Sequence, residues 1–116
     1  DAHQKIGVVH AEVMESYTSW GEFLGKLEDN NPCAKQSAVW GRDFVEYKDC
    51  EEYQKPLSGV DLLIHGHTPV KAPLKVGNRL HIDTGLVYGK HLTIYEMDSE
   101  EVFTFKLIDK VEEKIV

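Results

Sequence analysis

Four apolar runs, separated by turn-forming residues, follow one another through the second half of the chain and restrict what it can fold into. The runs read VDLLIHGH at 60–67, PLKVGNRLHIDTG at 73–85, LTIYEM at 92–97 and VFTFKLI at 102–108. Short apolar runs bounded by Gly, Pro, Asn and Asp are typical of strands in a β meander. Gly77 and Asn78 fit the two-residue turn of a hairpin, because both tolerate positive φ. We therefore expect residues 60–108 to be largely strand.

The second run also predicts which side chains share a face of its hairpin. Leu74 and Val76 precede the turn, and Leu80 and Ile82 follow it. Because side chains alternate along a strand, we expect these four to point to one face. His81 would then lie on the opposite face, in solvent.

The first half of the chain carries one strand pattern and one helix pattern. Residues 6–13 (IGVVHAEV) open with a β-branched run typical of a strand buried on both faces, with His10 at its C-terminal end. Further on, Thr18 or Ser19 can cap a helix whose apolar residues recur at helical spacing. Those expected in the core are Trp20, Phe23, Leu24 and Leu27. Residues 29–36 read as a loop and 44–54 as helix or irregular structure, so the whole pattern predicts an α/β fold with one or two helices.

The charge balance and the distribution of apolar residues exclude two kinds of partner. Thirteen Lys and Arg against 20 Asp and Glu give a net charge of −7, and the basic residues are scattered. Nucleic acid held by bulk electrostatics is therefore not expected. No stretch approaches the roughly 18 consecutive apolar residues of a membrane helix, so no membrane is expected either. Cys33 and Cys50 fit reduced thiols, which favours a cytoplasmic protein.

The histidine content points to metal or proton chemistry, since there are six in 116 residues. Two of them, His65 and His67, follow an apolar strand pattern, where a rigid scaffold can point side chains into a cleft. On one face of a strand this pair could grip a single ion, as in a structural zinc domain. The simpler alternative is that both form hydrogen bonds near the strand end. His3 and His91 have no partner pattern.

Four segments in register resemble the C-terminal half of the calcineurin-like metallophosphoesterases. They are VVHAE at 8–12, WGRD at 40–43, LIHGHTPVKAPLKVGNRLHIDTGLVYG at 63–89 and LTIYEM at 92–97. Within that superfamily they are most similar to the bacterial and phage lambda-type serine/threonine protein phosphatases. The resemblance implies part of an αββα sandwich, in which two mixed sheets lie between outer helices. It also implies a phosphoprotein or phosphopeptide substrate.

The resemblance implies roles for five residues. His10 and His67 would be nitrogen ligands of one ion in a centre of two divalent metals, Mn²⁺ first, with Zn²⁺ or Fe as alternatives. Arg42 would hold the substrate phosphate. His65 stands where relatives usually have an apolar residue, so it would lie behind the ligands or pack, and Tyr88 would lie at the rim or pack. The implied reaction is in-line attack on a phosphomonoester by a hydroxide that bridges the two metals.

The N-terminal half of the superfamily, with its motifs DxH, GDxxDRG and GNH(D/E), has no counterpart in this chain. That half supplies the remaining metal ligands and the histidine assigned to protonating the leaving group, so no catalytic residue is expected here. We expect residues 1–116 to be the C-terminal portion of one phosphoesterase domain, inactive without its N-terminal half and exposing one apolar sheet face. The alternatives are a noncatalytic interaction module or remnant of the fold, and a dinucleoside polyphosphate hydrolase. The oligomeric state stays open.

The segment DTG at 83–85 also matches the catalytic motif of aspartic proteases. In a chain of this length, one such motif could serve only as half of a homodimer. The resemblance instead places this segment in a β turn behind the phosphatase site, which is the interpretation we prefer.

Overall fold

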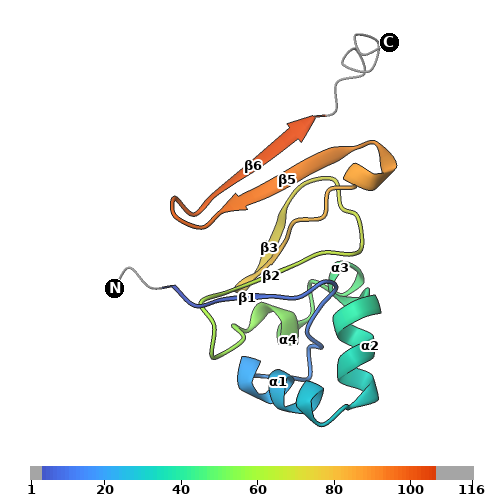
Figure 1. Cartoon of the computed structure of the whole chain (residues 1–116), viewed down its shortest axis with the longest axis vertical. Helices are drawn as coiled ribbons and strands as arrows, with labels where there is room; N and C mark the ends of the chain where they lie inside the picture. Colours follow the sequence, from blue (N-terminus) through green and yellow to red (C-terminus); the bar gives the residue numbers. More distant parts are fainter. Residues whose placement is uncertain (1–3, 107–116) are drawn as a thin grey trace.

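The computed structural model describes residues 4–106, which form a mixed four-stranded sheet, a separate hairpin and four α-helices (Figure 1). In the sheet, β1 (Ile6–Val8), β2 (Leu62–His65) and β4 (Arg79–His81) run parallel, and β3 (Leu74–Val76) pairs antiparallel with β4. The predicted α/β class is confirmed. The expected meander is wrong, because β4 pairs with β3 on one side and lies parallel beside β2 on the other. The strands are also shorter than expected, with loops between them.

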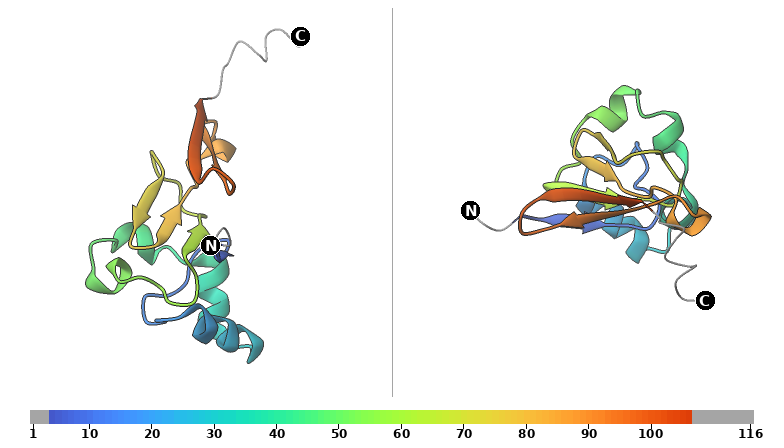
Figure 2. Two further views of the ribbon diagram at one scale, coloured as in Figure 1. Left: turned by 90° about the vertical axis from the view of Figure 1, so that its left-hand side faces the viewer. Right: turned by 90° about the horizontal axis from the view of Figure 1, so that it is seen from above.

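The second layer is the antiparallel hairpin of β5 (His91–Glu96) and β6 (Glu101–Lys106). It lies on one side of the four-stranded sheet, and the helices pack on the other side (Figure 2). Tyr95 joins the hairpin to the sheet, where it packs against a cluster of Leu62, Ile64 and Leu80. The outer face of the hairpin carries four apolar side chains that are each more than a third exposed, in agreement with the expected apolar sheet face. These are Leu92, Ile94, Phe103 and Phe105.

Helix α1 (Trp20–Glu28) begins where the sequence predicted, because the Ser19 hydroxyl accepts a hydrogen bond from the Glu22 amide at 3.0 Å. Phe23 is buried in the core, and Trp20 and Leu27 pack against that core while staying partly exposed. Leu24, expected inside, is 39% exposed. It falls beside the buried stripe rather than on it, since α1 lies at the edge of the molecule and buries only a narrow face.

Helix α2 (Pro32–Trp40) corrects the loop expected at 29–36. Asn31 caps it by accepting a hydrogen bond from the Ala34 amide at 3.0 Å, and proline at the first helical position needs no amide partner. The polar composition that suggested a loop was therefore a helix-start signal. Two single turns follow, α3 (Asp43–Glu46) and α4 (Glu51–Gln54), which fits the expected helix or irregular structure. Within residues 4–106, no helix is long and apolar enough to cross a membrane.

The β3–β4 hairpin turns at Gly77 and Asn78 as predicted, with Gly77 at φ +61°. Its register, however, places Val76 opposite Arg79, and Leu74 opposite His81. Facing residues of an antiparallel pair point to the same side, so the apolar side chains of β3 share a face with Arg79 and His81 rather than with Leu80. The expectation of one shared apolar face was wrong. His81, expected in solvent, is only 1% exposed.

Strand β1 is shorter and more exposed than the pattern at 6–13 predicted. It occupies the edge of the sheet, with β2 as its partner, and Val8 is 63% exposed. Beyond it, the chain leaves the sheet and carries Val13 into the core between the sheet and the helices. A β-branched run therefore signals a strand here, but not a central one.

Candidate functional site

His10 and His67 meet at one edge of the sheet. Each lies two positions beyond the end of its strand, β1 for His10 and β2 for His67. Because the two strands are parallel, their carboxyl ends lie side by side, which is where α/β sheets bind ligands. The Gly66 amide donates to the His10 carbonyl at 3.0 Å and ties the two segments together. The nitrogens His10 Nε2 and His67 Nδ1 are 3.1 Å apart.

The backbone of His67 is strained. Its φ is +80°, in the left-handed region that side chains with a Cβ rarely occupy. The imidazole is held between the ring of His10, with centroids 4.9 Å apart, and the indole of Trp40, which meets it edge-on at 5.7 Å. Residues held in such conformations cluster at functional sites, so this strain favours a role for His67 beyond packing.

The pair fits part of a metal centre. Two nitrogens each about 2.0–2.1 Å from one ion, and roughly at right angles, lie about 3 Å apart, which matches the His10 and His67 separation of 3.1 Å. His67 Nε2 is buried with no hydrogen-bond partner. Across residues 4–106, no group of three or more His, Cys, Asp or Glu could hold an ion. These two residues could therefore supply two ligands of a shell that needs others.

His65 occupies a different environment from His67. It is 3% exposed, its Nδ1–H donates to the Ala11 carbonyl at 2.8 Å, and its ring meets Phe44 edge-on at 4.5 Å. Strand β2 ends at His65, and the left-handed backbone at His67 breaks the alternation that would have placed both rings on one face. The structure thus places His65 within the core and does not bring the two histidines together as an HxH grip.

The buried imidazoles of His65 and His81 should make the fold sensitive to acid. Burial lowers the pKa of His65 to about 3 and also lowers the pKa of His81, so both are neutral when folded. In the unfolded chain they protonate below about 6.5. The contribution of His65 to stability is therefore present above pH 6.5 and is lost as the pH falls toward 3, by on the order of 4 kcal/mol. The contribution of His81 changes in the same direction. Urea denaturation between pH 7 and 4 measures this.

The matched variant for the acid test is His65→Phe, which keeps an aromatic ring but cannot protonate. Its free energy of unfolding should fall less than that of the original chain over the same pH range. Burial raises the pKa of Glu12, so its contribution changes in the opposite direction with pH, but that contribution is common to both proteins. Equal pH slopes for the two would contradict the assignment.

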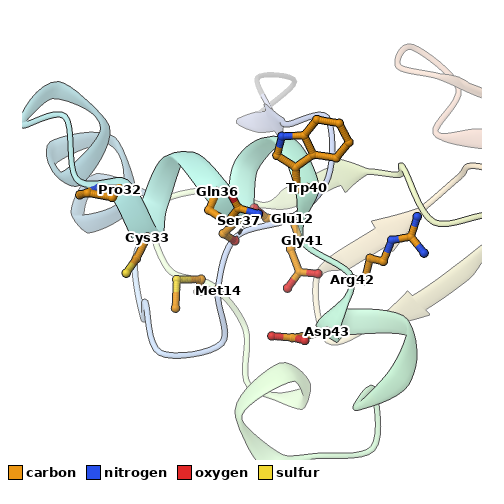
Figure 3. Close-up of a pocket in the computed structure, with 10 residues that line it drawn as sticks. All are labelled: Glu12, Met14, Pro32, Cys33, Gln36, Ser37, Trp40, Gly41, Arg42 and Asp43. Atoms are coloured by element: carbon orange, nitrogen blue, oxygen red, sulfur yellow. Dashed lines mark hydrogen bonds between the residues drawn. The ribbon is translucent and has the colours of Figure 1, made fainter.

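Arg42 lies in a groove beside the histidine pair. It is exposed at the N-terminus of α3 and lines a groove of about 640 Å³ together with Trp40 and Asp43 (Figure 3). His10 and His67 line a separate pocket of about 310 Å³ with Asp83. The phosphate-binding role that the resemblance implies for Arg42 predicted one pocket shared with the two histidines, and the structure has two pockets instead. The indole of Trp40, which touches His67 and lines the groove, joins the two.

Glu12 is a buried carboxylate that the sequence reasoning did not single out. It is 2% exposed and accepts hydrogen bonds from the Tyr53 hydroxyl at 2.7 Å and from the Phe44 amide at 3.1 Å. These bonds tie the segment after His10 to the segment after Arg42. The one signal available was an acidic residue within an apolar run, since a buried carboxylate needs partners.

The lack of a side chain at Gly41 leaves space for the side chain of Glu12. A Cβ on Gly41 would collide with Glu12 Cγ and lie 2.7 Å from the Ser37 carbonyl oxygen. Gly41→Ala should therefore destabilise the fold by about 2–3 kcal/mol, as overpacking does, and displace Arg42. Gly25→Ala is the control, because nothing lies within 4 Å of its Cβ and alanine favours a helix interior. Thermal denaturation in which both variants melted alike would contradict this account.

Two features that the sequence singled out, Tyr88 and the DTG segment at 83–85, lie in the turn that follows β4. Tyr88 belongs to a short 3-10 helix and is 69% exposed, so it contributes little to the core. In the DTG segment, Asp83 Oδ1 accepts from the Gly85 amide at 3.0 Å, and Thr84 Oγ1 hydrogen-bonds with Thr93 Oγ1 at 2.7 Å. Asp83 and Thr84 thus hold a turn against β5, which agrees with the β-turn interpretation.

Comparison with known proteins gives several curated relatives and no matching family model. The chain is 32% identical over 95 residues to bis(5'-nucleosyl)-tetraphosphatase PrpE (asymmetrical) of Anoxybacillus flavithermus, which covers 77% of this chain and 35% of the relative. It is 43% identical over 81 residues to the protein of the same name in Bacillus cereus, which covers 69% of this chain and 26% of the relative. The chain thus spans about a third or less of these relatives' length.

These relatives belong to the calcineurin-like metallophosphoesterase superfamily, so the resemblance found in the sequence is supported at that level. They are hydrolases, and their names give a dinucleoside tetraphosphate as substrate rather than a phosphoprotein. The narrower similarity to lambda-type protein phosphatases has no support from them.

Proposed function

We propose that this chain supplies part of the active site of a metal-dependent hydrolase that cleaves dinucleoside polyphosphates. The observation that carries the proposal is the meeting of His10 and His67 at the sheet edge, 3.1 Å apart, in a chain whose curated relatives are named as tetraphosphatases of this kind. The dinucleoside substrate was the alternative in the sequence analysis, and it now takes precedence over the protein phosphatase.

The reaction needs both charge neutralisation and a positioned water. Asymmetric hydrolysis of a bis(5'-nucleosyl) tetraphosphate adds one water across a phosphoanhydride bond and yields a nucleoside triphosphate and a nucleoside monophosphate. A pair of divalent ions, Mn²⁺ in the first instance, would supply Lewis-acid activation of the phosphoryl group and of water. His10 and His67 would hold one of these ions through Nε2 and Nδ1.

Two other residues complete the roles proposed for this chain. The exposed guanidinium of Arg42, beside Trp40, would grip two phosphate oxygens in a bidentate manner. His65 would act only from the core, where its Nδ1–H holds the Ala11 carbonyl next to the His10 segment. The remaining metal ligands and the acid that protonates the leaving group would come from an N-terminal half of the domain. The residues of this chain alone would then be inactive.

The test is hydrolysis by the full-length product of the gene. With Mn²⁺ present, diadenosine tetraphosphate should give AMP and ATP in equal amounts by ion-exchange chromatography. A phosphoserine peptide and p-nitrophenyl phosphate, assayed in parallel, measure the protein phosphatase alternative. Faster cleavage of the phosphopeptide would restore that alternative. A protein inert toward all three with every divalent metal would overturn the phosphoesterase proposal.

A further inference from the structure

The groove along α2 lies beside the histidine pair, and apart from Arg42 its lining has no part in the proposed roles. It holds about 640 Å³ and lies between α2, the segment after β1 and the start of α3 (Figure 3). Figure 3 shows Cys33 and Met14 at one end of its lining and Arg42 at the other, with Asp43 between them and Trp40 on the side opposite Asp43. Volumes of this size are those of pockets for small molecules.

The walls of the groove change in chemistry along its length. Cys33 and Met14 form a soft apolar end, suited to a flat ring that needs contact area rather than charge. Asp43 presents a carboxylate, which accepts hydrogen bonds from vicinal hydroxyl groups such as those of ribose. Arg42 provides a cation, which suits phosphate. The order is therefore ring, sugar, phosphate, the order of groups in a nucleotide.

The groove also leads toward the histidine pair. Trp40 lines the groove, is 61% exposed, and touches the ring of His67 edge-on. A phosphate chain that starts at Arg42 would thus pass the indole to reach His67. A large aromatic side chain left this exposed beside a candidate site offers contact area at little entropic cost.

We propose that this groove binds one nucleoside of the substrate, with the base against Met14 and Cys33 and the ribose hydroxyls on Asp43. The proposal rests on the proposed function, since the printed names of the relatives supply the dinucleoside. It goes beyond that function by giving the base and sugar a site on this chain. The occupant is a mononucleotide unit, so free AMP should bind there as well.

The direct test is protection of Cys33 from alkylation in the full-length protein, measured peptide by peptide with mass spectrometry. Cys33 is exposed and lines the groove, so saturating AMP should slow its reaction with iodoacetamide several-fold. Inorganic phosphate should not. Cys50, which is partly buried and lies outside the groove, is the internal control and should react at an unchanged rate. Failure of AMP to protect Cys33, or equal protection of both thiols, would overturn the proposal.

A second measurement separates this proposal from the function on which it rests. Cys33→Trp should fill the groove and lower the ratio of kcat/KM for diadenosine tetraphosphate to that for p-nitrophenyl phosphate by about tenfold or more, the scale of a lost pocket contact. Val39→Trp is the matched control, because Val39 is exposed on the same helix and does not line the groove. An unchanged ratio in Cys33→Trp would refute the groove while leaving the hydrolase intact. Loss of hydrolysis in the original protein, with AMP still protecting Cys33, would refute only the hydrolase.

Discussion

His67→Gly should make the fold more stable while removing the function. Glycine adopts the φ of +80° at position 67 without steric cost, so the free energy of unfolding should rise by roughly 1 kcal/mol. The same change removes the imidazole beside His10, and hydrolysis by the full-length protein should fall by roughly 100-fold or more. Urea denaturation and the rate of diadenosine tetraphosphate hydrolysis measure the two effects.

The control is His67→Asn, because asparagine also tolerates the left-handed region but offers no ring nitrogen. It should unfold close to the original protein and be as inactive as the glycine variant. Such opposite changes in stability and activity mark a residue kept for function. If either variant kept its activity, His67 would be a packing residue and the proposed metal ligation would be wrong.

Glu12→Ala should be among the most destabilising single changes in the described part of the chain. It leaves the Tyr53 hydroxyl and the Phe44 amide buried without their acceptor, and it leaves a cavity beside Gly41. Together these effects should lower the free energy of unfolding by about 3–4 kcal/mol. Chemical denaturation measures the change.

Glu15→Ala is the matched control for Glu12. Glu15 lies nearby and reaches the Tyr53 hydroxyl only at 3.5 Å, from a partly exposed position. Its loss should change the free energy of unfolding by less than about 0.5 kcal/mol. Similar losses for the two glutamates would show that the buried hydrogen bonds of Glu12 contribute little.

The sequence predicted the local helix caps and turns better than it predicted which strands pair with one another. Ser19 as a helix cap and Gly77 as a hairpin turn were correct, because both depend on bonds within a few residues. The parallel position of β4 beside β2 depends on contacts between distant segments, which no local pattern records. The shared apolar face was predicted wrongly although the turn was right, since a two-residue turn already pairs Val76 with Arg79. His81 does alternate with Leu80, but the face on which it lies is buried by distant segments.

At the site, the motifs predicted which residues are candidate ligands, but not which of them line the same pocket. His10 and His67 do meet, as the parallel ends of two strands require. The separation of Arg42 into the groove could not be predicted, because the N-terminal part of α2, which forms the wall of that groove, was expected to be a loop. Glu12 was not predicted as a buried residue, because its burial depends on a hydrogen bond from Tyr53, which is distant in the sequence.

The pairing of β1 with β2 has a consequence for the order in which the molecule assembles. His10 and His67 lie 57 positions apart, and the whole helical segment lies between them. Closing so long a loop is entropically slow, whereas the β3–β4 and β5–β6 hairpins close locally. Strand β1 is therefore expected to dock after the hairpins have formed. Since His10 follows β1, it reaches His67 only when β1 docks. The folding chain would therefore form most of its sheet before the two histidines come together.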